Sequence, residues 1–335
     1  MKRVLALVAA AAMVVGAFAI RGGGSGGDGG LAIPGRDEPV VLLRLQCATE
    51  LAEACAALAA ADDRIEVGEE RPGLFADTLL SGTDTSADVW LAPQPWVELV
   101  RQLDTTGGRA LGQPSAVLAR SPLVLTAFER STPDCGGEPV GWRCIGDAAA
   151  DLRPGIQRLD DTEGLFTLAQ AGTGFFGTEA YATNDFETPP ETGGPPFADW
   201  ATTLLRAVPR GSFGTPLATM LRTDTATFDF AATIEAVAAS AISGTRQEGE
   251  LRVIYPSPMA TVDVVAVPIG DGDEAAAAAL VALLEGGTGR TALSSAGWRV
   301  AGEPLATGID PAITVADGDG LPQPGVLAAL RDRLG

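Results

Sequence analysis

Four cysteines stand in two close pairs, Cys47 with Cys55 and Cys135 with Cys144. Neither pair has the C-x-x-C spacing of redox and zinc motifs, and no other residue of the chain could complete a metal site with them. Outside the cytoplasm, cysteines of this kind form disulfides. Four cysteines allow three connectivities, of which the two local loops are the simplest. We therefore expect one bond within each close pair, the alternative being four buried free thiols.

Two residue types that carry much of enzyme chemistry are almost missing. Histidine is absent from the 335 residues, and the 23 basic residues include a single lysine, Lys2. The absence of imidazole excludes Ser-His-Asp and Cys-His hydrolases and His-ligated zinc enzymes. The absence of lysine from the rest of the chain excludes a Schiff base, a P-loop lysine and a Ser-Lys dyad. No pair of carboxylates is singled out for glycoside hydrolysis. We therefore expect a protein that is not an enzyme.

The net charge and the length of the chain narrow the possible classes of protein further. The formal net charge is -20, and 46% of the residues are apolar. No nucleic-acid partner is expected, because phosphate binding depends on Lys and Arg neutralising the backbone. The apolar fraction is enough for a sizeable core, and the length predicts about two domains or one large two-lobed unit.

The beginning of the chain has the pattern of an export signal. Two basic residues at 2–3 precede an uncharged run over 4–20, which is typical of such signals. The A-x-A sequence at 17–19 favours cleavage, whereas the run is about long enough to span a bilayer, at the lower limit of ~17 residues. A flexible glycine-rich linker over 21–36 favours a retained anchor. We expect an extracytoplasmic protein, either membrane-anchored by residues 1–20 or secreted after cleavage of a signal peptide.

The rest of the chain alternates between strand and helix patterns. Strands are expected at 40–45, 65–67, 87–91, 123–127, 155–159, 251–255 and 262–268. Helices are expected at 48–61, 73–80, 96–103, 161–171, 197–208, 215–221, 228–243, 273–285, 288–296 and 325–334. The β-α-β-α-β order at the start predicts a parallel sheet covered by helices on both faces.

Several of these segments, in this order, resemble the type II periplasmic binding proteins, which are extracellular solute-binding proteins of bacterial transporters. The matching segments are GLFADTL at 73–79, ADVW at 87–90, SPLVL at 121–125, YP at 255–256, VDVVAVP at 262–268 and SSAGWR at 294–299. The order is more specific than any one piece. The subgroup that the chain most resembles is the domain found ahead of von Willebrand A domains in some exported bacterial proteins. The D-x-S-x-S metal motif of that second domain does not occur in this sequence.

The resemblance implies an α/β fold of two lobes, the periplasmic-binding-protein type II fold, with two hinge-crossing strands and a ligand cleft between the lobes. It places residues 37–125 and 260–335 in the first lobe and residues 126–259 in the second. The residue pattern agrees, because the strands near Leu123 and Val264 are the most apolar in the chain and flank a turn-rich middle. Discontinuous lobes of this kind close about a hinge.

The resemblance also implies where a ligand would be held. In the family, contacts come from loops at the carboxyl ends of strands and from helix N-termini that face the cleft. Carried across by position, the candidate ligand-binding residues are Gln46, Ala48, Thr49, Arg71, Gly73, Pro93, Gln94, Asp161, Thr162, Glu163, Gly164 and Tyr255. Ala48 and Gly73 stand where the family often has a hydroxyl residue, which argues against an oxyanion ligand. The side chains of Trp90, Trp96 and Trp200 could also line the cleft.

Simpler interpretations stand beside several of these assignments. Thr162 and Glu163 could cap a helix, Arg71 could pair at the surface with the neighbouring glutamates at 69–70, and Trp90 is more consistent with a core position. The Asp-Gly-Asp turns at 271–273 and 317–319 lack the spacing of a calcium loop. We expect neither a metal ion nor a cofactor.

The sequence thus predicts an extracytoplasmic, non-catalytic solute-binding protein that binds a small ligand between its lobes for an ABC-type transporter. The alternative is a degenerate binding-protein fold that acts as an envelope interaction or scaffolding module without a small ligand. The partner would be a membrane permease in the first case and a von Willebrand A protein in the second.

Overall fold

The chain is seen in a computed structural model that describes residues 42–104, 111–191, 193–211, 214–243, 250–270, 273–315 and 320–335. The expected signal or anchor over 1–20, the linker over 21–36 and most of the two Asp-Gly-Asp turns lie outside these residues. Within the described ranges, no helix has the length and apolar character needed to cross a membrane.

The first part of the sheet is built from four strands, β1 (Leu43–Ala48), β2 (Ile65–Glu70), β3 (Val89–Pro93) and β8 (Thr261–Pro268). β1 lies between β2 and β3, and both pairings are parallel. β8 pairs antiparallel with β3. All five residues of β3 are buried, as a central strand covered on both faces requires. The parallel pairing expected from the sequence is found for β1, β2 and β3. The antiparallel strand β8 makes the sheet mixed.

The second part of the sheet shares β4 (Ala119–Phe128) with the first. The first residues of β4, Ala119 to Pro122, pair with β8. Its remaining residues pair antiparallel with β6 (Phe230–Ile234) and β7 (Leu251–Ile254), and β6 pairs with the short β5 (Pro154–Gly155). The described strands have the order β2-β1-β3-β8-β4-β6-β5, with β7 also on β4. The sheet therefore passes from one part to the other where β4 changes partners.

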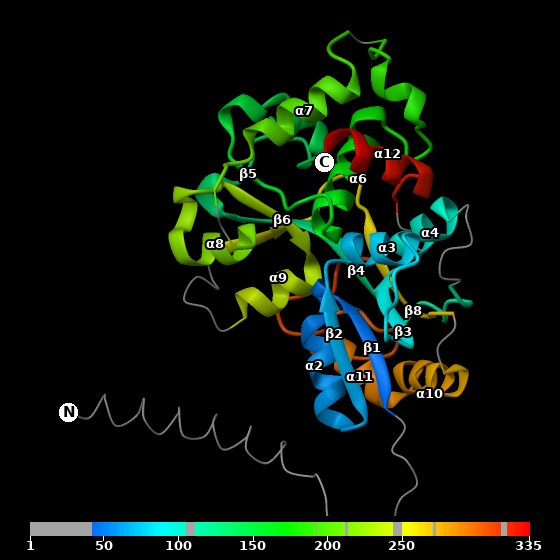
Figure 1. Cartoon of the computed structure of the whole chain (residues 1–335). Helices are drawn as coiled ribbons and strands as arrows, with labels where there is room; N and C mark the ends of the chain where they lie inside the picture. Colours follow the sequence, from blue (N-terminus) through cyan, green and yellow to red (C-terminus); the bar gives the residue numbers. More distant parts are fainter. Residues whose placement is uncertain are drawn as a thin grey trace, which may run out of the picture. The chain divides into compact units, whose positions relative to one another are not determined.

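The helices gather around the same two parts (Figure 1). The first part is covered by α2 (Ala52–Ala61), α3 (Pro72–Leu80), α4 (Gln94–Leu103), α10 (Glu274–Glu285) and α11 (Gly287–Ser295). The second carries α5 (Trp142–Asp147), α6 (Thr162–Phe176), α7 (Phe197–Ala207), α8 (Pro216–Thr223) and α9 (Glu235–Ile242).

Local sequence fixes some helix ends. Asp273 caps α10 by accepting from the backbone N–H groups of Ala275 and Ala276, and Gly177 ends α6 with a φ of 71°.

The prediction of one helix is wrong over the first half of its range. The segment 228–243 was expected to be a single helix, but its residues Phe230–Ile234 form β6 and only Glu235–Ile242 form α9. All five residues of β6 are buried. A strand buried on both faces shows no alternation between apolar and polar residues, so its pattern cannot be told from that of a buried helix. Pairing with β4 and β5 decides the structure here.

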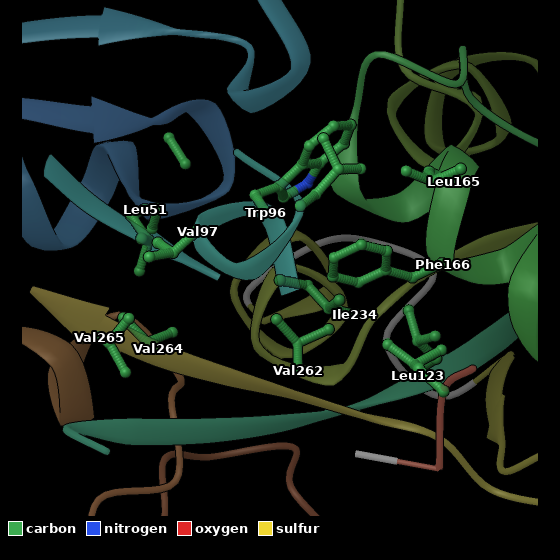
Figure 2. Packing of buried hydrophobic residues seen from close by; sticks show 14 of the residues in the cluster. Leu51, Trp96, Val97, Leu123, Leu165, Phe166, Ile234, Val262, Val264 and Val265 are labelled. Carbon is green, nitrogen blue, oxygen red and sulfur yellow. The ribbon is translucent and has the colours of Figure 1, made fainter. Parts of the chain in front are cut away.

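The largest apolar cluster is continuous between the two parts of the sheet. It includes Trp96 and Val97 of α4 and runs on to Phe166 of α6 and Ile234 of β6. Figure 2 shows Trp96 close to Phe166 within this cluster. Their rings stack with centroids 6.0 Å apart. A smaller cluster around Val124, Phe128, Leu217, Met220 and Phe228 lies within the second part.

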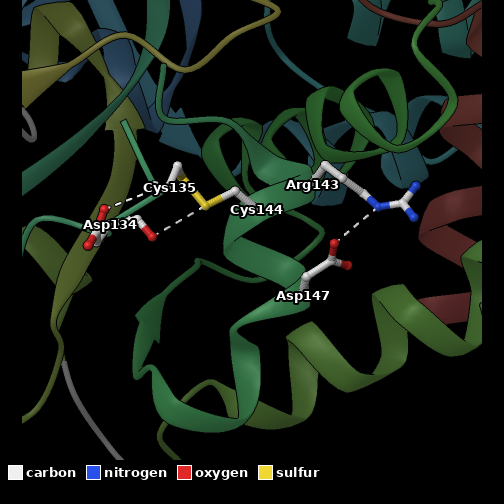
Figure 3. Close-up of a disulfide and its surroundings, with 6 residues drawn as sticks. Asp134, Cys135, Arg143, Cys144 and Asp147 are labelled. Atoms are coloured by element: carbon white, nitrogen blue, oxygen red, sulfur yellow. Dashed lines mark hydrogen bonds and ion pairs between the residues drawn. A yellow bond between two sulfur atoms is a disulfide. The ribbon is translucent and has the colours of Figure 1, made fainter. Parts of the chain in front are cut away.

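Both expected disulfides are confirmed. One bond joins Cys47, the second-last residue of β1, to Cys55 of α2, and the other joins Cys135 to Cys144 of α5. Figure 3 shows the second bond beside the Arg143–Asp147 ion pair on the same helix. Cys47 and Cys55 are fully buried, so the first bond lies inside the core between strand and helix.

Candidate functional site

Two groups of elements face each other where the parts of the sheet meet. We call the elements around β2, β1, β3 and β8 the first lobe and those around β5, β6 and β7 the second lobe. On the first lobe, the facing residues belong to the short helix η1 (Thr49–Leu51) after β1 and to the N-terminal ends of α3 and α4. On the second lobe they belong to the loop before α6 and to the first turn of α6. The residue boundaries of the lobes stay a prediction.

The loop before α6 is held to the start of α3 by two interactions. A guanidinium N–H group of Arg71 lies 2.7 Å from the carboxylate of Asp160. The backbone N–H group of Gly73 donates to the carbonyl oxygen of Asp160 at 3.0 Å. A Cβ atom at Gly73 would lie 2.8 Å from the Cα atom of Asp160, so glycine is required for this close approach. Arg71 therefore pairs across the lobes and not with its neighbours at 69–70.

Thr162 is the central link between the lobes. Its side chain is buried, with 1% of the residue exposed. Its hydroxyl group accepts a hydrogen bond from the indole Nε1 of Trp96 at 3.0 Å and donates to a carboxylate oxygen of Glu50. The side-chain cap that the simpler interpretation expected is absent at this helix start, where Asp161 is the N-cap residue without a side-chain cap bond. Thr162 thus connects η1 and α4 of the first lobe to α6 of the second.

Glu163 follows in the same turn and is also buried. Its two carboxylate oxygens accept hydrogen bonds from the amide of Gln157 and from the hydroxyl group of Thr233, the latter at 2.8 Å. Gly164 allows the preceding loop to pass close to α6, because a Cβ atom there would overlap the carbonyl oxygen of Arg158. The loop is therefore wrapped tightly around the N-terminus of the helix, with Glu163 fixed from both sides.

The carboxyl groups at this interface have raised pKa values. Burial raises the pKa of Glu50 to about 7, although the hydrogen bond from Thr162 opposes the shift. Burial and the charge of Glu50 raise the pKa of Glu163 to about 8. Burial and the charge of Asp160 raise the pKa of Asp161 to about 6. The cause is the same in each case, because a desolvated carboxylate is less stable than its neutral acid.

In the described ranges, no basic side chain is paired with Glu50 or Glu163. Within the part of the chain that the structure describes, neither carboxylate forms an ion pair, although Arg71 and Arg158 both pair with Asp160. Two carboxyl groups in this setting can keep a proton or accept an external positive charge. No three or more His, Cys, Asp or Glu side chains in the described ranges are grouped so that they could hold a metal ion.

The structure brings together only some of the residues expected from the sequence. Arg71, Gly73, Asp161, Thr162 and Glu163 meet at the lobe interface, as described above. Thr49 lies at its edge. It is exposed, and its hydroxyl group is 3.4 Å from a carboxylate oxygen of Glu50.

Other expected residues have structural partners of their own. Gln46 lies within β1 against Gly68, and Ala48 and Pro93 are buried ends of β1 and β3. The side-chain amide of Gln94 donates to Glu98, one turn later, at 2.6 Å. These positions flank the interface, and none of their hydrogen bonds described here goes to Glu50, Asp161 or Glu163.

Tyr255 lies at the hinge and not with the acidic groups. Its hydroxyl group donates to Glu235 at the start of α9, which also pairs with Arg299 at 2.6 Å. Burial and the Glu235 carboxylate raise the pKa of Tyr255 above its usual range. Tyr255 therefore belongs to a network that joins the lobes near the crossing strands.

Three residues of the interface were not expected from the sequence: Glu50, Asp160 and Gln157. Each is next to, or within a few residues of, an expected one. A signal was present for Glu50, because it follows Thr49 at the end of the first strand. Glu50 and Asp160 have partners far away in the chain, Thr162 and Arg71, which no local pattern reveals. The partner of Gln157 is Glu163, six residues later. Trp96 was expected to line the cleft, and it lies at the interface.

Comparison with solved structures finds the same fold in binding proteins. Iron-bound HitA from Pseudomonas aeruginosa aligns over 88% of this chain and 99% of its own, with a TM-score of 0.61 and 17% identity. The ferric binding protein from Campylobacter jejuni aligns over 88% and 99%, with a TM-score of 0.62 and 10% identity. A periplasmic thiamin binding protein aligns over 91% and 97%, with a TM-score of 0.58 and 13% identity. At these identities the likeness establishes the two-lobed periplasmic-binding-protein fold.

Sequence comparison gives the family. No curated protein matches the chain. The family model described as "Bacterial extracellular solute-binding protein" matches residues 43–299, which is well over half of the chain. That span contains all the described strands of both lobes and every interface residue described above. The chain therefore belongs to the bacterial extracellular solute-binding protein family, whose members bind solutes outside the cytoplasm without catalysing a reaction and work with ABC transporter permeases.

Proposed function

We propose that this protein captures a small, positively charged organic solute between its two lobes and presents it to an ABC-type permease. The observation that carries the proposal is that Glu50 of the first lobe binds Thr162, the residue before Glu163 of the second lobe, and that its charge raises the pKa of Glu163, without a basic partner for either carboxyl group in the described residues. A ligand cation placed between them would balance both charges. It would also be held by both lobes at once, which lobe closure requires.

The energetic argument rests on desolvation. A buried carboxylate is costly unless it is paired with a positive charge or protonated. An anionic ligand at the same place would add a third negative charge and increase the cost. Hydrogen bonds from Gln157 and Thr233 hold the carboxylate of Glu163 in one orientation, so the site is prepared for a directional donor such as an ammonium group.

The ligands of the structurally similar proteins bear on the choice of cation. Two of them bind iron and one binds thiamin, as their names state. Because no group of three or more His, Cys, Asp or Glu side chains that could hold a metal ion occurs in the described residues, we do not extend the iron binding to this chain. An organic cation needs fewer protein ligands than a metal ion does.

The proposal includes the lobe boundaries and the place of the protein in the cell. The first lobe comprises 37–125 and 260–335, the second comprises 126–259, and the lobes move about the strands that cross between them. Residues 1–20 anchor the protein to the membrane, with 21–36 as a tether, so that the binding unit stays near its permease. A von Willebrand A protein is the alternative partner suggested by the sequence resemblance.

A direct test is a thermal-shift screen followed by calorimetry. The probes are organic cations (choline, putrescine, arginine, thiamin) and, for contrast, ferric citrate, molybdate, sulfate and succinate. We expect at least one organic cation to bind and the oxyanions not to bind. Glu50→Gln and Glu163→Gln should each weaken cation binding by about tenfold or more, because a hydrogen bond to a charged group contributes about 1.5–3 kcal/mol.

The matched control is Glu66→Gln, which removes an exposed carboxylate of β2 in the first lobe. Its affinity should be unchanged. Tight binding of an oxyanion that both glutamine variants retain would overturn the choice of ligand class. The absence of any small-molecule binding would favour the scaffolding alternative.

A further inference from the structure

The last described helix, α12 (Pro324–Leu334), lies across both lobes. It packs against α4 of the first lobe and against α6, α7 and η4 (Thr183–Glu187) of the second. Figure 1 shows α12 between α4 on one side and α6 and α7 on the other. Its start lies near Gln102 of α4 and its end near Leu159, in the loop before α6. A single helix therefore spans the interface beside the residues proposed to hold the ligand.

Arg331 fixes α12 to the first lobe. Its two terminal nitrogens donate to the two carboxylate oxygens of Asp77 at 2.8 and 2.6 Å. One of them also donates to the carbonyl oxygen of Gly73 at 3.1 Å, and the guanidinium carbon lies 5.6 Å from the ring centre of Trp96. Planar, bidentate pairs of this kind are the stronger Arg–carboxylate interactions.

Two of the residues that Arg331 contacts, Gly73 and Trp96, also contact the second lobe. The N–H group of Gly73 donates to the carbonyl oxygen of Asp160, and the indole of Trp96 donates to Thr162. Arg331 thus contacts both residues that donate these hydrogen bonds, from the first-lobe side of the interface. This makes it a positioning residue for the interface, because it acts through Gly73 and Trp96.

The polar contacts of α12 with the second lobe are weaker than its bidentate pair with Asp77. The guanidinium of Arg333 lies 3.6 Å from the carboxylate of Glu187 in a pair whose side chains are 46% and 71% exposed. The same guanidinium lies 5.5 Å from the ring centre of Phe186. Leu334 lines a cavity of about 550 Å³ together with Leu159 and other apolar residues of the second lobe. An exposed ion pair and an open apolar contact separate more readily than a bidentate pair.

We infer that α12 is a strap that holds the two lobes together and that, when the lobes separate, it stays on the first lobe and leaves the second. The inference rests on the lobe opening that the proposed function requires, but not on the identity of the ligand. Contacts that exist only in the closed arrangement shift the population toward it. The strap therefore sets how much of the protein is open before a solute arrives, and so the apparent affinity for any solute that enters through the open form.

The test measures distances between spin labels by pulsed electron paramagnetic resonance, in the full chain with its native disulfides oxidised and no solute added. Labels are placed on engineered cysteines at three exposed positions: Glu66 in the first lobe, Arg206 in the second lobe and Asp332 on α12. The pair 66–206 reports lobe opening. The pairs 66–332 and 206–332 report which lobe α12 follows.

The informative variant is the double substitution Arg333→Ala with Leu334→Ala, which weakens the hold on the second lobe only. We expect a second, longer distance for the pairs 66–206 and 206–332, with a rise in the open fraction of about fivefold or more. The distance for the pair 66–332 should stay single. Arg331→Ala should instead broaden the pair 66–332, and Arg331→Lys, which keeps the charge but not the bidentate geometry, should recover only part of the wild-type distribution.

The matched control is Arg64→Ala, which removes another bidentate arginine pair, the local one with Asp62. It should leave all three distance distributions unchanged. The inference is overturned if the Arg333→Ala, Leu334→Ala double variant keeps the wild-type distances, or if α12 stays with the second lobe while the lobes part. Circular dichroism separates either result from misfolding. A failed solute screen leaves this test intact, since no solute is used.

Discussion

Glu235, the first residue of α9, receives two hydrogen bonds from the guanidinium of Arg299, at 2.6 Å from Nε and 2.8 Å from Nη2. Arg299 also donates to the backbone carbonyl groups of Asp310 and Ile313. The side chain of Glu235 is 1% exposed and that of Arg299 is 12% exposed. This buried pair joins the second lobe to the first beside the crossing strands, and it fixes the hinge about which the lobes would move.

Arg299→Ala should lower the free energy of unfolding by about 3–5 kcal/mol, because it leaves the carboxylate of Glu235 buried without its partner. Urea unfolding followed by tryptophan fluorescence measures the change. The control is Arg252→Ala, which removes an arginine from an exposed pair with Glu129 and should cost no more than about 1 kcal/mol. Similar losses in the two variants would contradict the structural role of the hinge pair.

The sequence predicted the parts of the fold that depend on neighbouring residues. The disulfides could be predicted because each closes a loop of fewer than ten residues, and α10 could be placed because Asp273 caps it locally. β6 could not. Its five buried residues run into the Ala-rich α9 without a change of pattern, and only pairing with β4, about a hundred residues away, makes them a strand.

The candidate site shows the same limit. Thr162 and Glu163 were expected because they begin a helix, and the resemblance to binding proteins places a ligand there. Their partners were not expected, because the contact between Thr162 and Glu50 joins positions 112 residues apart and that between Thr162 and Trp96 joins positions 66 apart. Raised pKa values depend on burial and on such contacts, so they cannot be derived from local sequence.

The two disulfides should differ in their resistance to reduction. Cys47 and Cys55 are fully buried, whereas Cys135 and Cys144 are partly exposed. Because a reducing thiolate must reach a sulfur atom, mild dithiothreitol should open the second bond first, as followed by alkylation and peptide mass mapping. Replacing Cys47 and Cys55 by Ala should lower stability by about 2.5–3 kcal/mol in the chain-entropy model. Simultaneous reduction of both bonds under native conditions would contradict the difference in access.

Stability without solute should fall as pH rises from about 4.5 to 8. Glu50 and Glu163 have folded-state pKa values of about 7 and 8, above the usual 4.5. In that window the folded protein binds more protons than the unfolded chain, so raising the pH favours unfolding. Below the window both states are protonated and the contribution is complete. Thermal melts across this range measure the slope, and Glu163→Gln should flatten it while Glu66→Gln should not.

Binding of a permanently charged cation should show the opposite dependence on pH. A cation between Glu50 and Glu163 favours their ionised forms, so binding releases protons and becomes tighter as pH rises toward 8. Each proton released can change the affinity by up to about tenfold per pH unit. Calorimetry with the strongest such binder, choline or thiamin, in buffers of different ionisation enthalpy counts the protons. An affinity that weakens over this range would place the cation elsewhere.

Gly73→Ala should hinder closure of the lobes while leaving the first lobe folded. The new methyl group would meet the backbone of Asp160 in the second lobe at 2.8 Å, whereas its neighbour in the first lobe, the ring edge of Trp96, lies at 3.0 Å and belongs to a side chain that can give slightly. The strain is therefore greatest in the closed arrangement, and it is relieved when the lobes part. We expect a larger radius of gyration by X-ray scattering and weaker solute binding, with little change in circular dichroism. Gly287→Ala is the matched control, since it also adds a methyl group near a helix start but finds no atom within 4 Å. A Gly73→Ala protein that scatters like the wild type and binds solute equally well would mean that this contact does not limit closure.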